Sequence, residues 1–163
     1  GDEGACNAVY KYSIFDEMTI SAISTPQPVF LPETKVWLDM CAWTVRAGFP
    51  SPAADHTRKR IDLNEHLIRN KEATFIFRVK GDSMNGIGIY EGDELLVDRS
   101  IEAKHGNIVL AVLNNEFTVK RLYRRGGVIK LVAENKLYPP IVVKEGEEFS
   151  VWGVVTYNLH KLY

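Results

Sequence analysis

Thr74-Phe75-Ile76-Phe77-Arg78-Val79 opens a region in which apolar and polar residues alternate with a period of two. Such a period places successive side chains on opposite faces of a β-strand. Turn-forming residues such as Glu91-Gly92-Asp93 and Arg125-Gly126-Gly127 punctuate the region. Six further segments between these turns are strand-like: Glu94–Asp98, Ile108–Leu113, Glu116–Tyr123, Val128–Val132, Pro140–Lys144 and Phe149–Tyr157. Seven short strands without intervening helices predict a mostly β domain.

The chain before residue 73 has a different character. Prolines within Thr25-Pro26-Gln27-Pro28 and Leu31-Pro32 forbid a long helix and indicate an irregular stretch. Ala47-Gly48-Phe49-Pro50-Ser51-Pro52-Ala53-Ala54 is typical of an exposed, extended linker, because a residue that precedes proline is driven out of the helical region. One short helix is expected between Asp62 and Asn70. Asp62 is its N-cap, and its inward-facing residues are Leu63, Leu67 and Ile68.

Length and composition exclude several classes of protein. The chain has 163 residues, of which 45% are hydrophobic and 25% charged, so we expect one domain with a real core, or one small domain plus a tail. The net charge of -1 argues against binding to nucleic acid or to an anionic membrane through overall positive charge. No apolar run approaches the roughly 20 residues of a membrane helix. We therefore expect no membrane partner.

The cysteines Cys6 and Cys41 form no CxxC pair and have no nearby pair of histidines. We therefore expect neither a zinc site nor a disulfide scaffold, and no metal or other cofactor is implied. The start of the chain, at Gly1, does not have the pattern of a signal peptide. A reducing cytoplasm is the expected compartment.

Gly81-Asp82-Ser83-Met84-Asn85-Gly86 follows directly on the first predicted strand. It is not the G-x-S-x-G nucleophile elbow, because Asn85 occupies the position of the second glycine. One interpretation makes Ser83 an ordinary turn residue. The other makes it a nucleophile at a strand end, beside backbone amides that can hold an oxyanion.

A serine nucleophile needs a base, and the histidines at 56, 66, 105 and 160 share no pattern and are interpreted as surface or capping residues. Lys120 lies within a predicted strand, on the same face as Thr118 and Leu122. Apolar surroundings favour the neutral amine, which can take a proton from a serine hydroxyl. The alternative is a surface lysine that lays its stem over apolar groups.

From Ala47 to Tyr163 the chain resembles the LexA/UmuD family, the self-cleaving Ser-Lys peptidases of the bacterial SOS response. No single matching piece is specific, but several occur in the family's order, and the interval from Ser83 to Lys120 also matches. The pieces are Ala47-Gly48-Phe49-Pro50-Ser51-Pro52-Ala53-Ala54-Asp55, Arg60-Ile61-Asp62-Leu63-Asn64, Gly81-Asp82-Ser83-Met84, Glu91-Gly92-Asp93, His105-Gly106-Asn107-Ile108-Val109, Glu116-Phe117-Thr118-Val119-Lys120-Arg121-Leu122 and Trp152-Gly153-Val154-Val155.

The resemblance implies a fold and a role for each matching position. The fold is the family's C-terminal peptidase domain of short, twisted antiparallel strands, preceded by an extended N-terminal arm. Ser83 would be the nucleophile and Lys120 its general base, and the amides of Ser83 and Asp82 would form the oxyanion hole. The scissile bond would be Ala47-Gly48, which divides the chain into an arm, residues 1–47, and a peptidase and dimerisation domain, residues 48–163.

Partners follow from the same resemblance. It implies that a RecA filament on single-stranded DNA stimulates the cleavage. It also implies a homodimer paired through the strand Phe149–Tyr157, and in that case Val155→Lys should yield monomers. The same apolar strand is equally consistent with an interior strand of the sheet.

Two roles within the family stay open. The first is a UmuD-like SOS regulator whose cleavage relieves repression, and the alternative is an accessory subunit of an error-prone translesion DNA polymerase. Phe49-Pro50-Ser51-Pro52-Ala53-Ala54-Asp55 resembles UmuD, whereas the Ala47-Gly48 bond is typical of the repressors. Residues 1–46 do not have the pattern of a helix-turn-helix, so contact with operator DNA would need residues outside this chain or an unusual fold of the arm.

Two readings from other classes predict different behaviour. A β-rich interaction module whose serine and lysine are relics would not cleave itself under any condition. A type I signal peptidase shares Ser-Lys chemistry but carries membrane anchors, and no apolar run of that length is present in residues 1–163, so this class is not expected.

Overall fold

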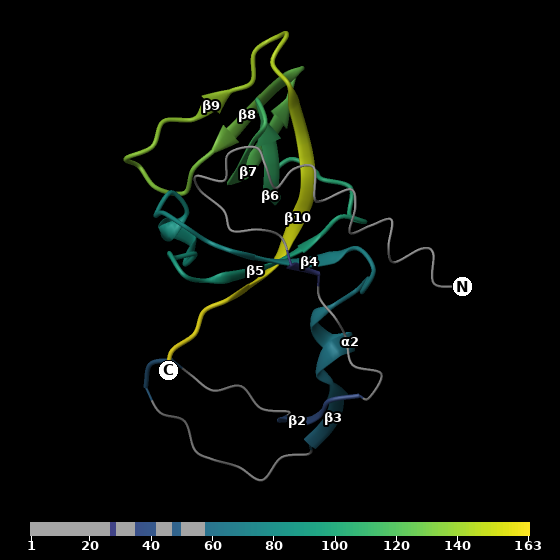
Figure 1. Ribbon diagram of the computed structural model, residues 1–163. Helices are drawn as coiled ribbons and strands as arrows, with labels where there is room; N and C mark the ends of the chain where they lie inside the picture. Colours follow the sequence, from purple (N-terminus) through teal and green to yellow (C-terminus); the bar gives the residue numbers. More distant parts are fainter. Residues whose placement is uncertain (1–26, 29–34, 42–46, 50–57) are drawn as a thin grey trace, which may run out of the picture. The chain divides into compact units, whose positions relative to one another are not determined.

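The computed structural model describes residues 27–28, 35–41, 47–49 and 58–163 (Figure 1). These residues fall into two compact units. The larger unit contains residues 27–28 and 72–163, and the smaller contains the described residues between 30 and 71. The expected division into residues 1–47 and 48–163 concerns a cleavage position and stays a prediction.

The smaller unit pairs strand β2, Trp37–Cys41, antiparallel with strand β3, Arg58–Asp62. β2 was not expected, because this part of the chain was interpreted as irregular. The physical reason is that all residues of β2 are exposed, so no alternation of apolar and polar residues marks the strand. The side chain of Arg60 on β3 lies over the ring of Trp37, with 5.8 Å between the guanidinium carbon and the ring centroid.

Helix α2, Leu63–Leu67, follows β3 directly and confirms the expected short helix. Asp62 is its N-cap, as predicted, and its Oδ1 accepts a hydrogen bond from the amide of Asn64 at 3.2 Å. The same oxygen accepts from the amide of Val36 at 3.1 Å, which joins the start of the helix to the segment before β2. Leu63, like the other predicted inward residues, is half-buried.

The larger unit is an eight-stranded antiparallel sheet in the order β1-β4-β5-β10-β6-β7-β8-β9. All seven predicted strands are present, which confirms the mostly β class. β9 is shorter than predicted, and β7 and β10 are longer. The bounds are β1 Gln27–Pro28, β4 Thr74–Arg78, β5 Glu94–Asp98, β6 Ile108–Leu113, β7 Glu116–Arg125, β8 Val128–Val132, β9 Ile141–Val142 and β10 Phe149–Leu159.

The period of two along the strands builds two hydrophobic clusters. On β6, Leu110 joins one cluster, whereas Val109 and Ala111 join the other. β7 divides in the same way, with Val119 in the first cluster and Leu122 in the second. Each fully buried side chain of this size stabilises the fold by about 1.5–3 kcal/mol. The even-numbered side chains of β7, Lys120 among them, therefore leave the strand on the side opposite Val119.

β10 is an interior strand of the sheet and runs between β5 and β6, as the long yellow strand in Figure 1 shows. Its pairing with β6 shifts register between Val151 and Gly153. Gly153 has no room for a side chain, because an added Cβ would lie 2.6 Å from Val97 Cγ1. The shift puts Trp152 in the first cluster, where its ring contacts Phe77 at 5.0 Å between centroids.

Candidate active site

Ser83 lies in the short segment between β4 and β5, which also contains the 3-10 turn η1, Asn85–Ile87. Gly81 has a φ of +90°, a left-handed conformation that suits glycine, and it turns the chain away from β4. Met84 is 2% exposed and belongs to the first hydrophobic cluster. The burial of Met84 anchors the segment, so the neighbouring Ser83 is held half-buried at the edge of the core.

Lys120 reaches Ser83 from the middle of β7. Its Nζ lies 3.1 Å from Ser83 Oγ, 2.7 Å from Thr118 Oγ1 and 3.1 Å from the carbonyl oxygen of Val119. The residue is only 8% exposed, so it is a buried lysine and not a solvated surface one. Thr118 shares its face of the strand, as the sequence predicted.

Burial lowers the pKa of Lys120, because an ammonium loses its hydration in the protein interior. The charged form donates to three neutral oxygens. The neutral amine has two N–H donors and one lone pair. With its donors on Thr118 and Val119, the lone pair faces Ser83 Oγ and can accept the serine proton.

Two pockets meet at this pair. The inner pocket has a volume of about 80 Å³, and its wall combines apolar residues with Arg78, Thr118 and the residues it shares with the outer pocket. The outer pocket, of about 370 Å³, is more open. Both are lined by Lys80, Gly81, Ser83 and Lys120, whereas Phe77, Val79, Met84, Leu95 and Val119 line the inner one and Asp82, Tyr138, Pro139 and Ile141 the outer one. The serine hydroxyl therefore stands where a small apolar group and an extended chain can both approach.

The backbone amides around Ser83 differ in their hydrogen bonding. The amide of Asn85 donates to the carbonyl of Asp82 at 3.3 Å, and that of Gly86 donates to the carbonyl of Glu134 at 2.7 Å. Within the described part of the chain, the amides of Asp82 and Ser83 have no acceptor. Two unused donors next to a serine hydroxyl are what an oxyanion hole requires.

The loop between β8 and β9 braces the serine segment from one side. Asn135 Nδ2 donates to the carbonyl of Asp82 at 3.0 Å, and the Tyr138 hydroxyl donates to Asp82 Oδ1 at 2.5 Å. The approach at Gly86 is so close that an added Cβ would lie 2.3 Å from the Glu134 carbonyl oxygen. Glu134 is in turn ion-paired with Arg121 of β7, which neighbours Lys120. The serine and the lysine are thus tied to one common support.

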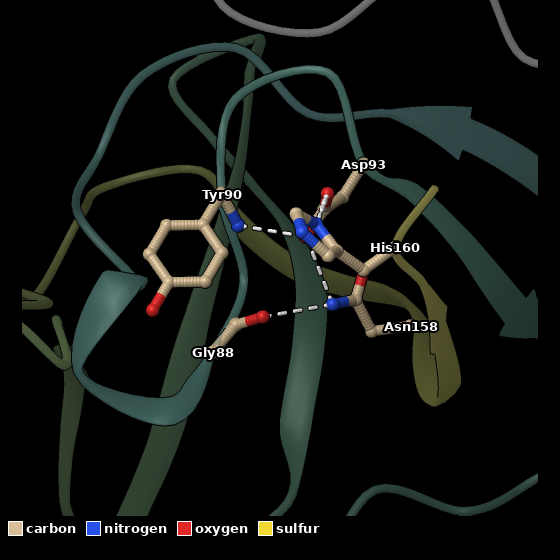
Figure 2. Close-up of polar contacts among 5 residues, drawn as sticks. All are labelled: Gly88, Tyr90, Asp93, Asn158 and His160. Carbon is tan, nitrogen blue, oxygen red and sulfur yellow. Dashed lines mark hydrogen bonds and ion pairs between the residues drawn. The ribbon is translucent and has the colours of Figure 1, made fainter. Parts of the chain in front are cut away.

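The end of β10 contacts a later part of the same segment between β4 and β5 (Figure 2). Asn158 Nδ2 donates to the carbonyl of Gly88 and to Asp93 Oδ2, both at 2.9 Å. The Nδ1 atom of His160 lies 2.5 Å from Asp93 Oδ1, and the Tyr90 amide donates to Asp93 Oδ2 at 2.8 Å. These contacts hold the chain just after η1 against the last residues of the sheet.

Asp93 is 3% exposed, so burial raises the pKa of its carboxyl group. The hydrogen bonds from the Tyr90 amide, Asn158 and His160, together with the charge of His160, outweigh burial and hold the pKa of Asp93 below its ordinary value. Asp93 is therefore the charged centre of this C-terminal brace.

The structure brings together Asp82, Ser83 and Lys120, three of the residues singled out in the sequence. Ala47 and Gly48 belong to the smaller unit, where they are exposed and lie in a bend with Phe49, so these residues are not the extended segment that was expected. Cys41 is a free, exposed cysteine. Residues 50–54 of the predicted linker, His56 and Cys6 lie outside the described residues.

Sequence reasoning missed both braces. His160 is an exposed histidine, as interpreted, but its pairing with the buried Asp93, 67 positions away, was not expected. No local pattern marks such a pair, although a Glu-Gly-Asp turn with a polar residue in the last strand is a weak signal. Tyr138 and Asn135 were also missed, because they lie in a loop that periodicity does not describe.

Among the described residues, no three His, Cys, Asp or Glu side chains gather as they would around a metal ion. None of the described helices is both long and apolar enough to cross a membrane.

An antiparallel β domain that buries a lysine against a pocket serine has the geometry of a serine peptidase domain. Residues 39–156 match the Peptidase S24-like family model, and the chain belongs to this family of SOS-response proteins, the LexA/UmuD group of generally self-cleaving serine peptidases.

Three curated bacterial proteins illustrate the relationship. Protein MucA of Salmonella typhimurium is 44% identical over 71% of this chain and 79% of its own length. Protein SamA of Salmonella typhimurium strain LT2 is 45% identical over the same shares. The LexA repressor of Cupriavidus taiwanensis is 44% identical over 68% of this chain and 50% of its own length.

Proposed function

We propose that this protein cleaves its own Ala47-Gly48 bond with Ser83 as nucleophile and Lys120 as general base. The observation that carries the proposal is the 3.1 Å contact between Lys120 Nζ and Ser83 Oγ at a buried lysine whose pKa is lowered by that burial. Burial favours the neutral amine that a general base requires.

The reaction proceeds in two halves. Ser83 Oγ bonds to the Ala47 carbonyl carbon while its proton passes to Lys120, and the amides of Ser83 and Asp82 stabilise the oxyanion. The bond to Gly48 then breaks, and Lys120 returns the proton to the leaving amine of Gly48. Water, activated by the same lysine, releases Ala47 from the ester. The products are residues 1–47 and 48–163.

The pocket supports Ala47 as the residue before the cut. The inner pocket, with a volume of about 80 Å³ and apolar residues such as Phe77 and Leu95 in its wall, has room for a methyl side chain. Gly48 adds no bulk on the other side of the bond. Because nucleophile and substrate belong to one chain, proximity is already supplied, and control lies in how often the segment around Ala47 docks. A RecA filament on single-stranded DNA stimulates cleavage by binding the docked conformer better than the undocked one.

The proposed biological role is that of a UmuD-like SOS regulator whose self-cleavage relieves repression of DNA-damage genes. Its similarity to a LexA repressor supports this role. The alternative is an accessory subunit of a translesion DNA polymerase, activated by the same cut. Matches over 79% of the lengths of MucA and SamA support a UmuD-like layout, in which either role is available. Operator binding by the uncut protein, or polymerase binding by residues 48–163, separates the two roles.

We also propose a homodimer formed through the end of β10. Among the described strands, β6 pairs with β10 only as far as Val154, whereas β5 continues to Leu159. On the side away from β5, the edge of β10 after Val154 is therefore available to pair with a second copy of the chain. Val155 packs against the first hydrophobic cluster, so Val155→Lys would also disturb the core. Tyr157, 41% exposed, is the better position at which to test the interface.

The test of cleavage is the intact mass of the chain after incubation at pH 7 and at about pH 10, for the wild type and for Ser83→Ala. Alkaline pH deprotonates lysine, whose reference pKa is about 10.4, so it permits cleavage without RecA. Fragments that end at Ala47 and begin at Gly48, absent in Ser83→Ala, are expected. A wild-type chain that stays whole at both pH values and with RecA filament and nucleotide would make this protein a binding module instead.

A further inference from the structure

The residue immediately before the proposed nucleophile is a carboxylate held by a tyrosine. The Tyr138 hydroxyl donates to Asp82 Oδ1 at 2.5 Å, a length typical of a strong bond to a charged acceptor. Asn135 from the same loop holds the Asp82 carbonyl at 3.0 Å. The loop between β8 and β9 therefore fixes both the side chain and the backbone of Asp82.

Asp82 can influence the charge state of Lys120, because it is the source of negative charge in the pockets that the lysine lines. Both residues line the outer pocket, and Asp82 is the one carboxylate among the described residues that line either pocket. The further titratable or charged groups there are Arg78, Lys80 and Tyr138. Glu134, which lies on the same loop as Tyr138, is engaged in its ion pair with Arg121 of β7.

A carboxylate within about 4–6 Å of a lysine favours the ammonium form and raises its pKa. A freely rotating Asp82 side chain could approach Lys120 Nζ and keep this base protonated. In the structure, Lys120 hydrogen-bonds to the oxygens of Ser83, Thr118 and Val119, all of them uncharged. The carboxylate of Asp82 is directed instead to the Tyr138 hydroxyl.

We propose that Tyr138 is a positioning residue that holds the Asp82 carboxylate away from Lys120, so that the neutral amine is retained for Ser83. This inference rests on the proposed function and adds a group that controls its base. The hydrogen bond to Asp82, with the charge of that carboxylate, raises the pKa of Tyr138. The tyrosine hydroxyl therefore stays protonated and hydrogen-bonded to Asp82 over the alkaline range in which Lys120 loses its proton.

The experiment compares the pH profiles of self-cleavage of the full chain and its variants. Tyr138→Phe removes only the hydroxyl, and Tyr138→Phe with Asp82→Asn also removes the charge that it held. Tyr163→Phe is the control, because Tyr163 is exposed and belongs neither to the site nor to the strand of the proposed dimer. Tyr138→Phe should raise the midpoint of the profile by about one pH unit, so that cleavage below the midpoint is about tenfold slower. The double variant should return to the wild-type midpoint, and Tyr163→Phe should not move it.

Two results would overturn the role of Tyr138. One is a midpoint that does not move in Tyr138→Phe, because a merely structural role lowers the rate equally at every pH. The other is a shift that persists in the double variant, since the Asp82 charge is then not its cause.

A second measurement separates this inference from the proposed function. The Lys120 side-chain carbon resonance is titrated by NMR in Ser83→Ala and in Ser83→Ala with Tyr138→Phe, neither of which needs to cleave. A higher lysine pKa in the second variant supports the role of Tyr138 even if the wild-type chain never cuts itself. Equal pKa values contradict it even if cleavage is established.

Discussion

Lys120 Nζ lies within 3.1 Å of Ser83 Oγ although the two residues are 37 positions apart in the chain. The antiparallel pairing of β6 with β7 sets Lys120 opposite Val109, in the middle of the sheet. The burial of Met84 in the first hydrophobic cluster fixes the serine segment. The contact is therefore held by two independently buried elements and does not depend on the flexibility of a lysine chain.

The pH dependence of cleavage has a defined sign. Burial lowers the pKa of Lys120 from its ordinary value of 10.5, so the neutral fraction grows as the pH rises. The cleavage rate should rise about tenfold per pH unit and level off at a pH below 10.5. The measurement is the rate of fragment appearance by mass spectrometry across the alkaline range.

Lys120→Arg is the matched control for that profile, because arginine keeps the positive charge but does not lose its proton in proteins. Cleavage by this variant should fall by about a thousandfold or more, as in other cases where one member of a catalytic set is removed. A variant that retains a tenth of the wild-type rate would show that the lysine acts through its charge and not as a base.

Gly86→Ala should separate the serine segment from its support. The new Cβ would lie 2.3 Å from the Glu134 carbonyl oxygen and would disrupt the hydrogen bond from the Gly86 amide. We expect a loss of about 1–3 kcal/mol in the free energy of unfolding, typical of overpacking, and slower cleavage. Thermal denaturation and the cleavage assay measure the two effects.

Asn85→Ala is the control for Gly86→Ala, because it changes a half-buried side chain of the same turn without adding an atom near Glu134. It should retain cleavage within a few-fold of wild type. If Gly86→Ala cleaves as fast as Asn85→Ala, the contact with Glu134 does not position Ser83.

Asp93→Asn should weaken the C-terminal brace in a pH-dependent way. Because the pKa of Asp93 is lowered in the folded protein, its contribution is fully present above the unfolded value, about 3.8, and is lost as the pH falls through the lower folded value. In a Ser83→Ala background the variant should lose about 1–2 kcal/mol of unfolding free energy at pH 5–7, and this deficit should shrink below about pH 4.

Glu91→Gln is the comparison for Asp93→Asn, since it neutralises an exposed carboxylate of the same turn. Urea denaturation at several pH values gives both differences. Equal, small effects of the two substitutions would show that the brace adds no stability beyond that of a surface charge.

The dimer proposal is tested at Tyr157. Tyr157→Lys places a charge on an exposed position of β10 and should convert a dimer into monomers in sedimentation velocity. Val128→Lys, on β8 at a position that is 42% exposed, introduces the same charge on a different strand and should leave the dimer intact. A Tyr157→Lys protein that sediments as a dimer would place the interface elsewhere.

Much of the fold was predictable because local sequence patterns, namely hydrophobic alternation and helix capping, specify its strands and its helix. Alternation along β4 and apolar runs such as Ile108–Leu113 predict strands wherever a face is buried, and Asp62 predicts a helix start because its side chain caps a neighbouring amide. β2 was not predictable in this way, because none of its residues is buried.

The sequence by itself determined seven of the eight strands of the larger unit, all except β1, which lies in a stretch interpreted as irregular. It also supplied a serine after a strand and a lysine within one, to which the family resemblance assigns the chemistry. Only the tertiary structure decided that Lys120 is buried against Ser83, that Tyr138 holds Asp82, and that Asp93 meets Asn158 and His160. The physical reason is the separation along the chain of the residues that interact. Periodicity and capping act between near neighbours in the chain, whereas these contacts join segments that only the pairing of the sheet and the packing of its core bring together.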